Sequence, residues 1–231
     1  IEEPENHMHP HMQQMLVRYL YEAQENLNFQ IILTTHSSDI VKNLEIEDIR
    51  VLKKEKNKTQ EYDLSVFMKD LDEDKKKFYE KFFGVTMYPL IFSDKAIFYE
   101  GDTERLFFET LLSRTNVLGA IFPESDNSIG RRLRSSYISL IQVSGDYAHR
   151  YFDFVDYLDI RTVVFTDIDY AKKFNSLDEI KEERKGEDEW KKISSNSVLR
   201  TILDLKAYES VQELFNLMQE GSCVEKVNEI G

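Results

Sequence analysis

Apolar residues recur at helical spacing near the start of the chain and then crowd into a short run. The helical positions are Met15, Leu16, Tyr19, Leu20, Ala23 and Leu27. This spacing predicts an amphipathic helix from Met12 onward, and the dense apolar run at residues 29–34 predicts a buried strand after it. The run His36-Ser37-Ser38-Asp39 then offers side chains that can cap a helix N-terminus, which predicts a short helix ending near Asn43.

The next segments alternate in a way that predicts a hairpin and then a helical connector. Residues 49–53 and 60–64 flank a polar, Lys-rich turn, which is typical of two antiparallel strands. Between residues 65 and 88 the apolar positions follow a helical stripe, while the charge run at 70–77 is best explained as a solvated helix face.

From residue 95 the pattern becomes a strand–helix alternation. Strands are predicted at 95–99, 138–143 and 161–166, and helices at 102–114 and 147–158. Alternation of this kind predicts an α/β fold with a parallel sheet covered by helices. In such sheets functional groups gather at the carboxyl ends of the strands.

Composition narrows the function classes. The 231 residues include 30 basic and 43 acidic side chains, giving a net charge of −13, which argues against a nucleic-acid binder that relies on a basic surface. The single cysteine, Cys223, excludes an internal disulfide framework and fits a reducing cytosol. Apolar runs are far shorter than the roughly 20 residues of a membrane helix, so we expect a cytoplasmic protein without a membrane partner.

Carboxylates follow two of the predicted strands. Glu100 ends the first strand, and Glu104 lies one turn into the next helix, after a turn at Gly101. Asp167 and Asp169 end the last strand and point to one side of it. If the strands are neighbours, four carboxylates converge, and their repulsion is relieved by a divalent cation such as Mg²⁺ or Mn²⁺. Phosphodiester hydrolysis or transfer is the chemistry that such a site supports.

A simpler interpretation exists for each piece. A Glu after a strand is often an exposed turn residue or a favourable charge at a helix N-terminus, and Asp-x-Asp occurs by chance. The order of the two pieces, both at strand ends, favours the metal site.

These residues carry a resemblance to a known family. Glu100-Gly101-x-x-Glu104, followed by Asp167-x-Asp169, resembles the Toprim domain of topoisomerases, primases and nucleases. More narrowly, the segments QVSGDYAH at 142–149 and SSNSVL at 194–199 resemble the OLD (overcoming lysogenization defect) family of ATP-dependent endonucleases. Members of that family join an ABC-type ATPase to a C-terminal Toprim nuclease.

The resemblance implies roles for the four carboxylates. Glu100 would be the general base or a metal ligand, and Glu104, Asp167 and Asp169 would be metal ligands of a two-ion site that uses Mg²⁺ or Mn²⁺. Catalysis would rest on Glu100, Asp167 and Asp169. The family also uses a basic residue after Asp-x-Asp, for which the candidates are Lys191, Lys192, Arg200, Lys206 or a residue beyond Gly231.

The first residues resemble part of an ATP site. The segment IEEPE at 1–5 resembles the end of a Walker B strand, where Glu2 would support Mg²⁺ and Glu3 would polarise the attacking water. Residues 6–10 resemble a D-loop, and TTHS at 34–37 resembles an H-loop whose His36 touches a γ-phosphate. The alternative for His36 is a helix-capping residue. No phosphate loop of the form GxxxxGK(S/T) occurs in the sequence, so ATP hydrolysis is expected only in the full-length protein.

The resulting hypothesis divides the chain into three parts. We expect the C-terminal part of an ABC-type ATPase domain at 1–64, a helical connector at 65–92 and a Toprim nuclease domain at 93–231, with the completeness of its C-terminus left open. The resemblance implies a fragment of a homo-oligomeric endonuclease that nicks or cleaves DNA, with anti-phage defence as its setting. The alternative is a RecF-like or SMC-like ATPase tail that binds DNA or dimerises, with an idle Toprim-like domain. A primase-like or topoisomerase-like protein is a third reading, but no tyrosine lies in a recognisable nucleophile setting.

Overall fold

The computed structural model describes residues 1–55, 58–113, 136–143, 145–166, 170–172 and 192–194. Two compact units divide the chain. The first comprises Ile1–Ile97, Glu109–Ile141 and Asp153–Val163, and the second comprises Phe98–Phe108, Gln142–Phe152 and Val164–Gly231. Several strands and helices begin in one unit and end in the other.

The helices, in chain order, are α1 (Pro10–Leu27), α2 (Ser38–Val41), α3 (Leu64–Lys69), α4 (Glu73–Phe82), α5 (Asp102–Ser113) and α8 (Phe152–Tyr157). Tighter or wider turns form the 3-10 helices η1 (Ile46–Asp48), η3 (Tyr88–Phe92) and η5 (Gly145–Tyr151), and the π-helix η2 (Phe83–Met87). The strands are β1 (Arg50–Glu55), β2 (Lys58–Asp63), β3 (Lys95–Tyr99), β4 (Ile138–Gln142), β5 (Arg161–Val164), β6 (Tyr170–Lys172) and β7 (Lys192–Ser194). None of the helices within these residues is both long and apolar enough to cross a membrane.

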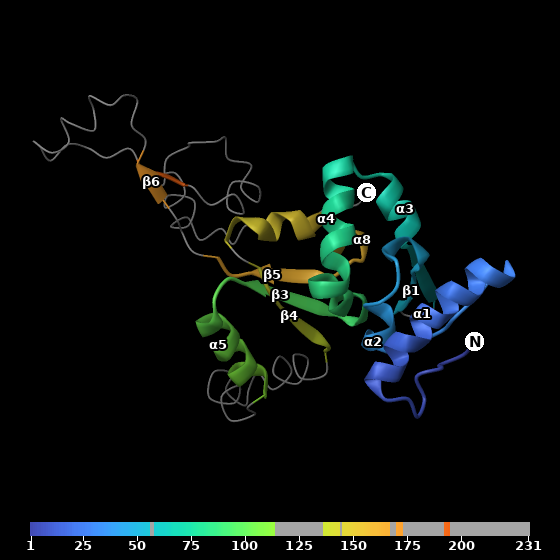
Figure 1. Ribbon diagram of the computed structural model, residues 1–231. Coiled ribbons are helices and arrows are strands. Elements are labelled where there is room, and N and C mark those ends of the chain that lie inside the picture. Colours follow the sequence, from blue (N-terminus) through green and yellow to red (C-terminus); the bar gives the residue numbers. More distant parts are fainter. Residues whose placement is uncertain (56–57, 114–135, 144, 167–169, 173–191, 195–231) are drawn as a thin grey trace, which may run out of the picture. The chain divides into compact units, whose positions relative to one another are not determined.

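The sheets confirm the predicted α/β class. β3 lies between β4 and β5 in a three-stranded parallel sheet (Figure 1). Asp94 N donates to Tyr137 O at 2.9 Å, and Val143 N donates to Tyr99 O at 2.9 Å, so β3 and β4 advance together in the same direction. The predicted hairpin is also confirmed, because β1 pairs with β2 in antiparallel register.

The predicted buried strand at residues 29–34 is wrong. These residues form one parallel bridge, between Glu2 and Thr34, and Ile32 is 71% exposed. A strand becomes buried only when neighbours and helices cover it, and in the part of the chain that the structure describes only residues 1–3 pair with this segment.

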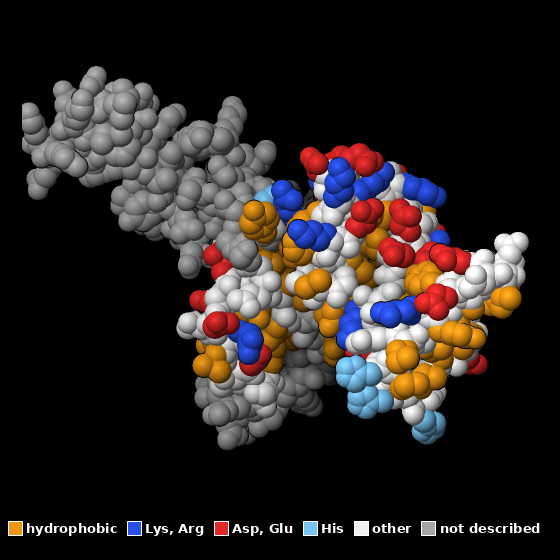
Figure 2. Space-filling view, viewed as in Figure 1, with side chains coloured by type: hydrophobic (Ala, Val, Ile, Leu, Met, Phe, Trp, Pro, Cys, Tyr) orange, Lys and Arg blue, Asp and Glu red, His pale blue; other side chains and the backbone are white. Residues whose placement is uncertain are grey.

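Helix α1 confirms the predicted helix but exposes much of its apolar stripe. Met15 and Tyr19 are 63% and 66% exposed, while Gln13 and Val17 are buried. Figure 2 shows apolar side chains gathered over this helix, with histidines near its beginning. The burial face is therefore rotated away from the face that the hydrophobic pattern predicted.

The predicted helix at 147–158 is two elements, the 3-10 helix η5 and the short helix α8. In η5 the buried residues Ala148 and Tyr151 lie three positions apart, which matches the three-residue turn of a 3-10 helix. The segment is therefore helical as predicted, but its first part has the period of a 3-10 helix and not that of an α-helix.

Aromatic rings form the centre of the first unit. The Phe67 ring of α3 lies 5.1 Å from the Tyr79 ring of α4 and 5.6 Å from the Phe154 ring of α8, measured between centroids. Tyr157 of α8 also donates its hydroxyl to the Asp63 carbonyl at 2.8 Å. Helices α3 and α4 and the end of β2 are therefore packed together with α8.

The backbone of the π-helix η2 lies very close to the backbone at the end of α2. A Cβ atom at Gly84 would lie 2.5 Å from the backbone oxygen of Lys42, the C-cap residue of α2. This gap is shorter than any normal carbon–oxygen contact, and a carbonyl oxygen of the backbone cannot rotate away as a side chain would. Only glycine fits at this position.

We expect Gly84→Ala to destabilise the protein by about 1–3 kcal/mol, because the added methyl group overpacks against the Lys42 backbone. The sign is informative, since Gly→Ala inside a helix normally stabilises by up to about 1 kcal/mol. Thermal unfolding followed by circular dichroism measures the change. Val85→Ala is the matched control, because Val85 lies in the same π-helix and is 69% exposed; an unchanged melting temperature for Gly84→Ala would contradict the steric argument.

Candidate functional site

The carboxyl ends of three parallel strands meet at one edge of the sheet, within the second unit. Val143 N donates to Tyr99 O at 2.9 Å, and Phe165 N donates to Phe98 O at 2.8 Å. These bonds align the chain after β4 and β5 with the end of β3, where Glu100 follows. The edge is the place where parallel α/β sheets carry their functional groups.

The Glu100 carboxylate is held from the neighbouring strand. Thr166, two residues past the end of β5, donates its hydroxyl to Oε1 of Glu100. On the other side, Gln142 Nε2 donates to the Glu100 backbone oxygen at 3.2 Å. Glu100 is half-buried, and these contacts fix both its backbone and its carboxylate.

Glu104 turns back toward the strand end from the first turn of α5. Its Oε2 accepts a hydrogen bond from the Gly101 backbone N–H at 3.0 Å. A Cβ atom at Gly101 would lie 2.6 Å from that same oxygen, so glycine leaves room for the contact. The negative side chain also faces the positive end of the α5 dipole, which stabilises it. The predicted pair Glu100 and Glu104 is therefore placed on the same strand-to-helix turn.

Aromatic side chains hold the start of α5 against the strands that end beside it. Phe108 of α5 is buried, and its ring centroid lies 4.6 Å from that of Phe165 and 6.4 Å from that of Tyr99. These contacts hold the first two turns of α5 against the ends of β3 and β5. The orientation of Glu104 thus depends on apolar contacts made by residues on the same helix.

The other half of the predicted site lies outside the described residues. Asp167 and Asp169 are not described, nor are three candidate basic residues, Lys191, Arg200 and Lys206. The fourth, Lys192, begins β7, which pairs with β6. Among the residues that the structure describes, no three His, Cys, Asp or Glu side chains lie close enough together to hold a metal ion.

In the first unit, residues 1–3 and 34–36 bring together the predicted ATP-site residues. Glu2 forms a parallel bridge with Thr34, and Glu3 N donates to Thr34 O at 2.9 Å. The Nε2 atom of His36 lies 3.5 Å from Oε1 of Glu3, with the histidine side chain 85% exposed. The structure therefore places two of the predicted ATP-site residues, Glu3 and His36, beside each other.

The backbone beside these residues is strained. Glu3 and His7 have φ angles of 39° and 68°, in the left-handed region that disfavours side chains. Each such residue costs of order 1–3 kcal/mol and persists only where the surroundings hold it in place.

Sequence reasoning missed two residues that hold this segment, Glu5 and Gln13. Oε1 of Glu5 accepts from both the Thr35 hydroxyl and the His36 backbone N–H, each at 2.8 Å. Burial raises the Glu5 pKa, but hydrogen bonds from its own N–H, from His36 and from Thr35 outweigh it, so the pKa lies below its usual value. Glu5 could have been noticed in the sequence, because it is a third acidic residue close to Glu2 and Glu3.

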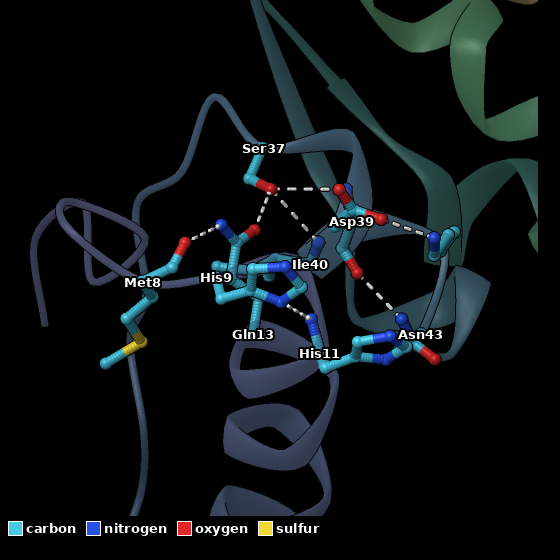
Figure 3. A network of polar contacts seen from close by, with 9 residues as sticks. Met8, His9, His11, Gln13, Ser37, Asp39, Ile40 and Asn43 are labelled. Atoms are coloured by element: carbon cyan, nitrogen blue, oxygen red, sulfur yellow. Dashed lines mark hydrogen bonds and ion pairs between the residues drawn. The ribbon is translucent and has the colours of Figure 1, made fainter.

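Gln13 is buried in α1, where its side chain links two loops (Figure 3). Its Nε2 donates to the Met8 carbonyl at 3.0 Å, and its Oε1 accepts from the Ser37 hydroxyl at 2.5 Å. Ser37, one of the four residues predicted to offer capping side chains, is also the N-cap of α2, and its hydroxyl accepts from the Asp39 and Ile40 N–H groups. No pattern in the sequence points to Gln13, because a polar residue on a helix is ordinarily exposed.

Comparisons with known proteins agree with this layout. Residues 91–169 match the family described as overcoming lysogenization defect protein-like, TOPRIM domain, and residues 1–41 match the AAA ATPase domain family. The chain is also similar to Endonuclease GajA of Bacillus cereus (strain HuB5-5), with 30% identity over 193 residues. That alignment covers 74% of this chain and 26% of the relative, so the chain spans about a quarter of the relative's length.

The Toprim match contains Glu100, Glu104 and both aspartates, and the ATPase match contains Glu2, Glu3 and His36. The expected combination of an ATPase segment with a Toprim domain is therefore present in the expected order. Residues 91–169 therefore match an OLD-like Toprim domain, and a match to an AAA ATPase domain precedes it at residues 1–41.

Proposed function

We propose that this chain carries the nuclease site of a Mg²⁺- or Mn²⁺-dependent DNA endonuclease of the OLD family. The observation that carries the proposal is the hydrogen bond from the Thr166 hydroxyl to the Glu100 carboxylate. Thr166 directly precedes Asp167 in the chain. The bond therefore links the start of the Asp-x-Asp motif to Glu100 of the other predicted motif. The similarity to an endonuclease supports the same activity.

The donor set of the site fits a hard divalent cation. Glu100 and Glu104 each use one carboxylate oxygen in a hydrogen bond from the chain, at Oε1 and Oε2 respectively. Each carboxylate has a second oxygen, and oxygen ligands of this kind are those that Mg²⁺ and Mn²⁺ prefer. We propose that Asp167 and Asp169 complete the set, with two ions bound.

The residues of the chain divide the work in this proposal. Glu104, Asp167 and Asp169 hold the cations, while Glu100 serves as a ligand or accepts a proton from the attacking water. Thr166 and Gln142 orient Glu100 through its carboxylate and its backbone oxygen. When bound, the metal would stabilise the charge that develops on the phosphate and lower the pKa of a bound water.

The N-terminal segment extends the proposal to ATP. We propose that Glu2, Glu3 and His36 act in an ATP site that requires a phosphate loop from elsewhere in the full-length protein, so this chain alone would not hydrolyse ATP. The proposed division is an ATPase part at 1–64, a connector at 65–92 and a Toprim nuclease at 93–231. A homo-oligomeric, cytoplasmic protein of anti-phage defence is the setting that the family resemblance supports.

We expect the full-length protein to nick or cleave supercoiled plasmid in the presence of Mn²⁺, and Asp167→Ala and Glu100→Gln to lower the rate at least about 100-fold, because each removes a charged ligand or base. Gel analysis of plasmid conversion over time measures the rate, and excess EDTA should abolish it. Asp102→Asn is the matched control, since Asp102 is exposed on the first turn of α5.

Equal plasmid conversion by wild-type protein and Asp167→Ala would contradict the nuclease proposal. Zero conversion by both, with plasmid binding retained, would favour the alternative function, a RecF-like or SMC-like tail that binds DNA or dimerises with an idle Toprim-like domain. A mobility-shift measurement with the same plasmid separates these outcomes.

Thr166→Val should slow plasmid nicking about tenfold and raise the Mn²⁺ concentration needed for half-maximal rate, because a hydrogen bond to a charged group contributes roughly 1.5–3 kcal/mol. Thr166→Ser keeps the hydroxyl and should restore both quantities. A valine variant with wild-type Mn²⁺ dependence would show that Thr166 does not orient Glu100.

A further inference from the structure

A closed ring of hydrogen bonds surrounds the loop that presents His36, and Glu5 is part of it. The Glu5 carboxylate accepts from the Thr35 hydroxyl at 2.8 Å, and Ser37 N donates to that hydroxyl oxygen at 2.9 Å. The Ser37 hydroxyl donates to Gln13 at 2.5 Å, Gln13 donates to the Met8 carbonyl at 3.0 Å, and Met8 N donates back to the Glu5 carbonyl at 2.9 Å.

The direction of each bond in the ring is fixed by chemistry. A backbone N–H can only donate, so the Thr35 hydroxyl oxygen accepts a hydrogen bond from Ser37. The single O–H group of Thr35 then donates its hydrogen bond to Glu5. The Ser37 oxygen likewise accepts from the N–H groups of Asp39 and Ile40, so its proton goes to Gln13 (Figure 3). Glu5 can take part only through an unprotonated oxygen, because its Oε1 accepts from two donors.

Glu5 also reaches the residue that carries the imidazole. The His36 backbone N–H donates to Oε1 of Glu5 at 2.8 Å, while the His36 ring nitrogen Nε2 lies 3.5 Å from Oε1 of Glu3. Since the His36 side chain is 85% exposed, few contacts of the ring itself hold it in place. Its position is therefore set mainly by the backbone that Glu5 anchors.

The carboxylate of Glu5 is itself enclosed. Its second oxygen, Oε2, is buried and accepts no hydrogen bond from any described residue. A buried oxygen without a partner is unfavourable, so the two hydrogen bonds at Oε1 are the interactions that offset it. The left-handed backbone of Glu3 and His7, on either side of Glu5, shows that this segment is held in an unfavourable conformation.

We propose that Glu5 is a positioning residue of the ATP site, whose carboxylate ties the loop at residues 35–37 to the segment after Glu3 and so keeps the His36 imidazole beside the Glu3 carboxylate. Thr35 and Gln13 complete this clamp. Thr35, which precedes His36, is bound by Glu5, and Ser37, which follows His36, is bound by Gln13. This inference rests on the proposed function only in that Glu3 and His36 act on ATP; the clamp itself is a property of the chain described here.

The test compares variants of the full-length protein in steady-state ATP hydrolysis. Glu5→Ala and Thr35→Val should lower kcat about tenfold with the KM for ATP changed less than about twofold, because the clamp orients His36 without touching the nucleotide. Thr35→Ser keeps both hydrogen bonds of the hydroxyl and should restore kcat. Hydrogen–deuterium exchange gives a second readout, with faster exchange of the His36 and Ser37 amides in Thr35→Val and protection like that of the wild type in Thr35→Ser.

The outcomes separate this inference from the ATPase proposal. Glu3→Gln and His36→Ala report on the ATP site directly, and unchanged hydrolysis in both would overturn the ATPase assignment together with the role of the clamp. Loss of hydrolysis in these two variants, with wild-type kcat in Thr35→Val and Glu5→Ala, would overturn the positioning role alone. Unchanged amide exchange in Thr35→Val would overturn the clamp itself, whatever the kinetics. If Glu5→Ala does not fold, the Thr35 pair carries the test.

Discussion

Two backbone hydrogen bonds set the geometry on which the candidate nuclease site depends. The bonds from Val143 to Tyr99 and from Phe165 to Phe98 fix the register of three parallel strands, so that the strands end at one edge. A shift of one residue in either pairing would turn the following side chains to the opposite face of the sheet. Glu100 and Thr166 meet only because this register is kept.

The acidity of the chain limits how it could bind DNA. A net charge of −13 makes long-range attraction of DNA unfavourable, so the proposed nuclease would need short-range contacts at a defined place to bind DNA. Carboxylates gathered at a sheet edge provide such a place when they hold divalent cations, since each cation reverses the local charge. In the proposed site, carboxylates that repel a phosphate in the absence of metal would bind it through the cations once metal is bound.

Sequence patterns predicted those parts of the structure that depend on local periodicity. The strand β3, the helix α5 and the hairpin of β1 and β2 each follow from residues that are neighbours in the chain. The segment at 29–34 failed because burial of a strand depends on what lies beside it, which its own residues do not encode. The contacts of Glu5 and Thr166 were equally hidden, since their partners lie 30 and 66 positions away. Glu100, Asp167 and Asp169 could be proposed from the sequence because they follow predicted strands in the order of a known motif; the structure describes Glu100 directly after the end of β3, and the two aspartates lie outside the described residues.

The close approach of Gly84 to Lys42 has a mechanical consequence. Lys42 is the C-cap of α2, the short helix that follows His36, and Gly84 lies in the π-helix η2, which precedes η3 and β3 in the chain. Where two backbones touch, no flexible side chain lies between them to absorb a displacement. We therefore expect a displacement of α2 to displace η2 as well, because the backbones of Lys42 and Gly84 are in direct contact.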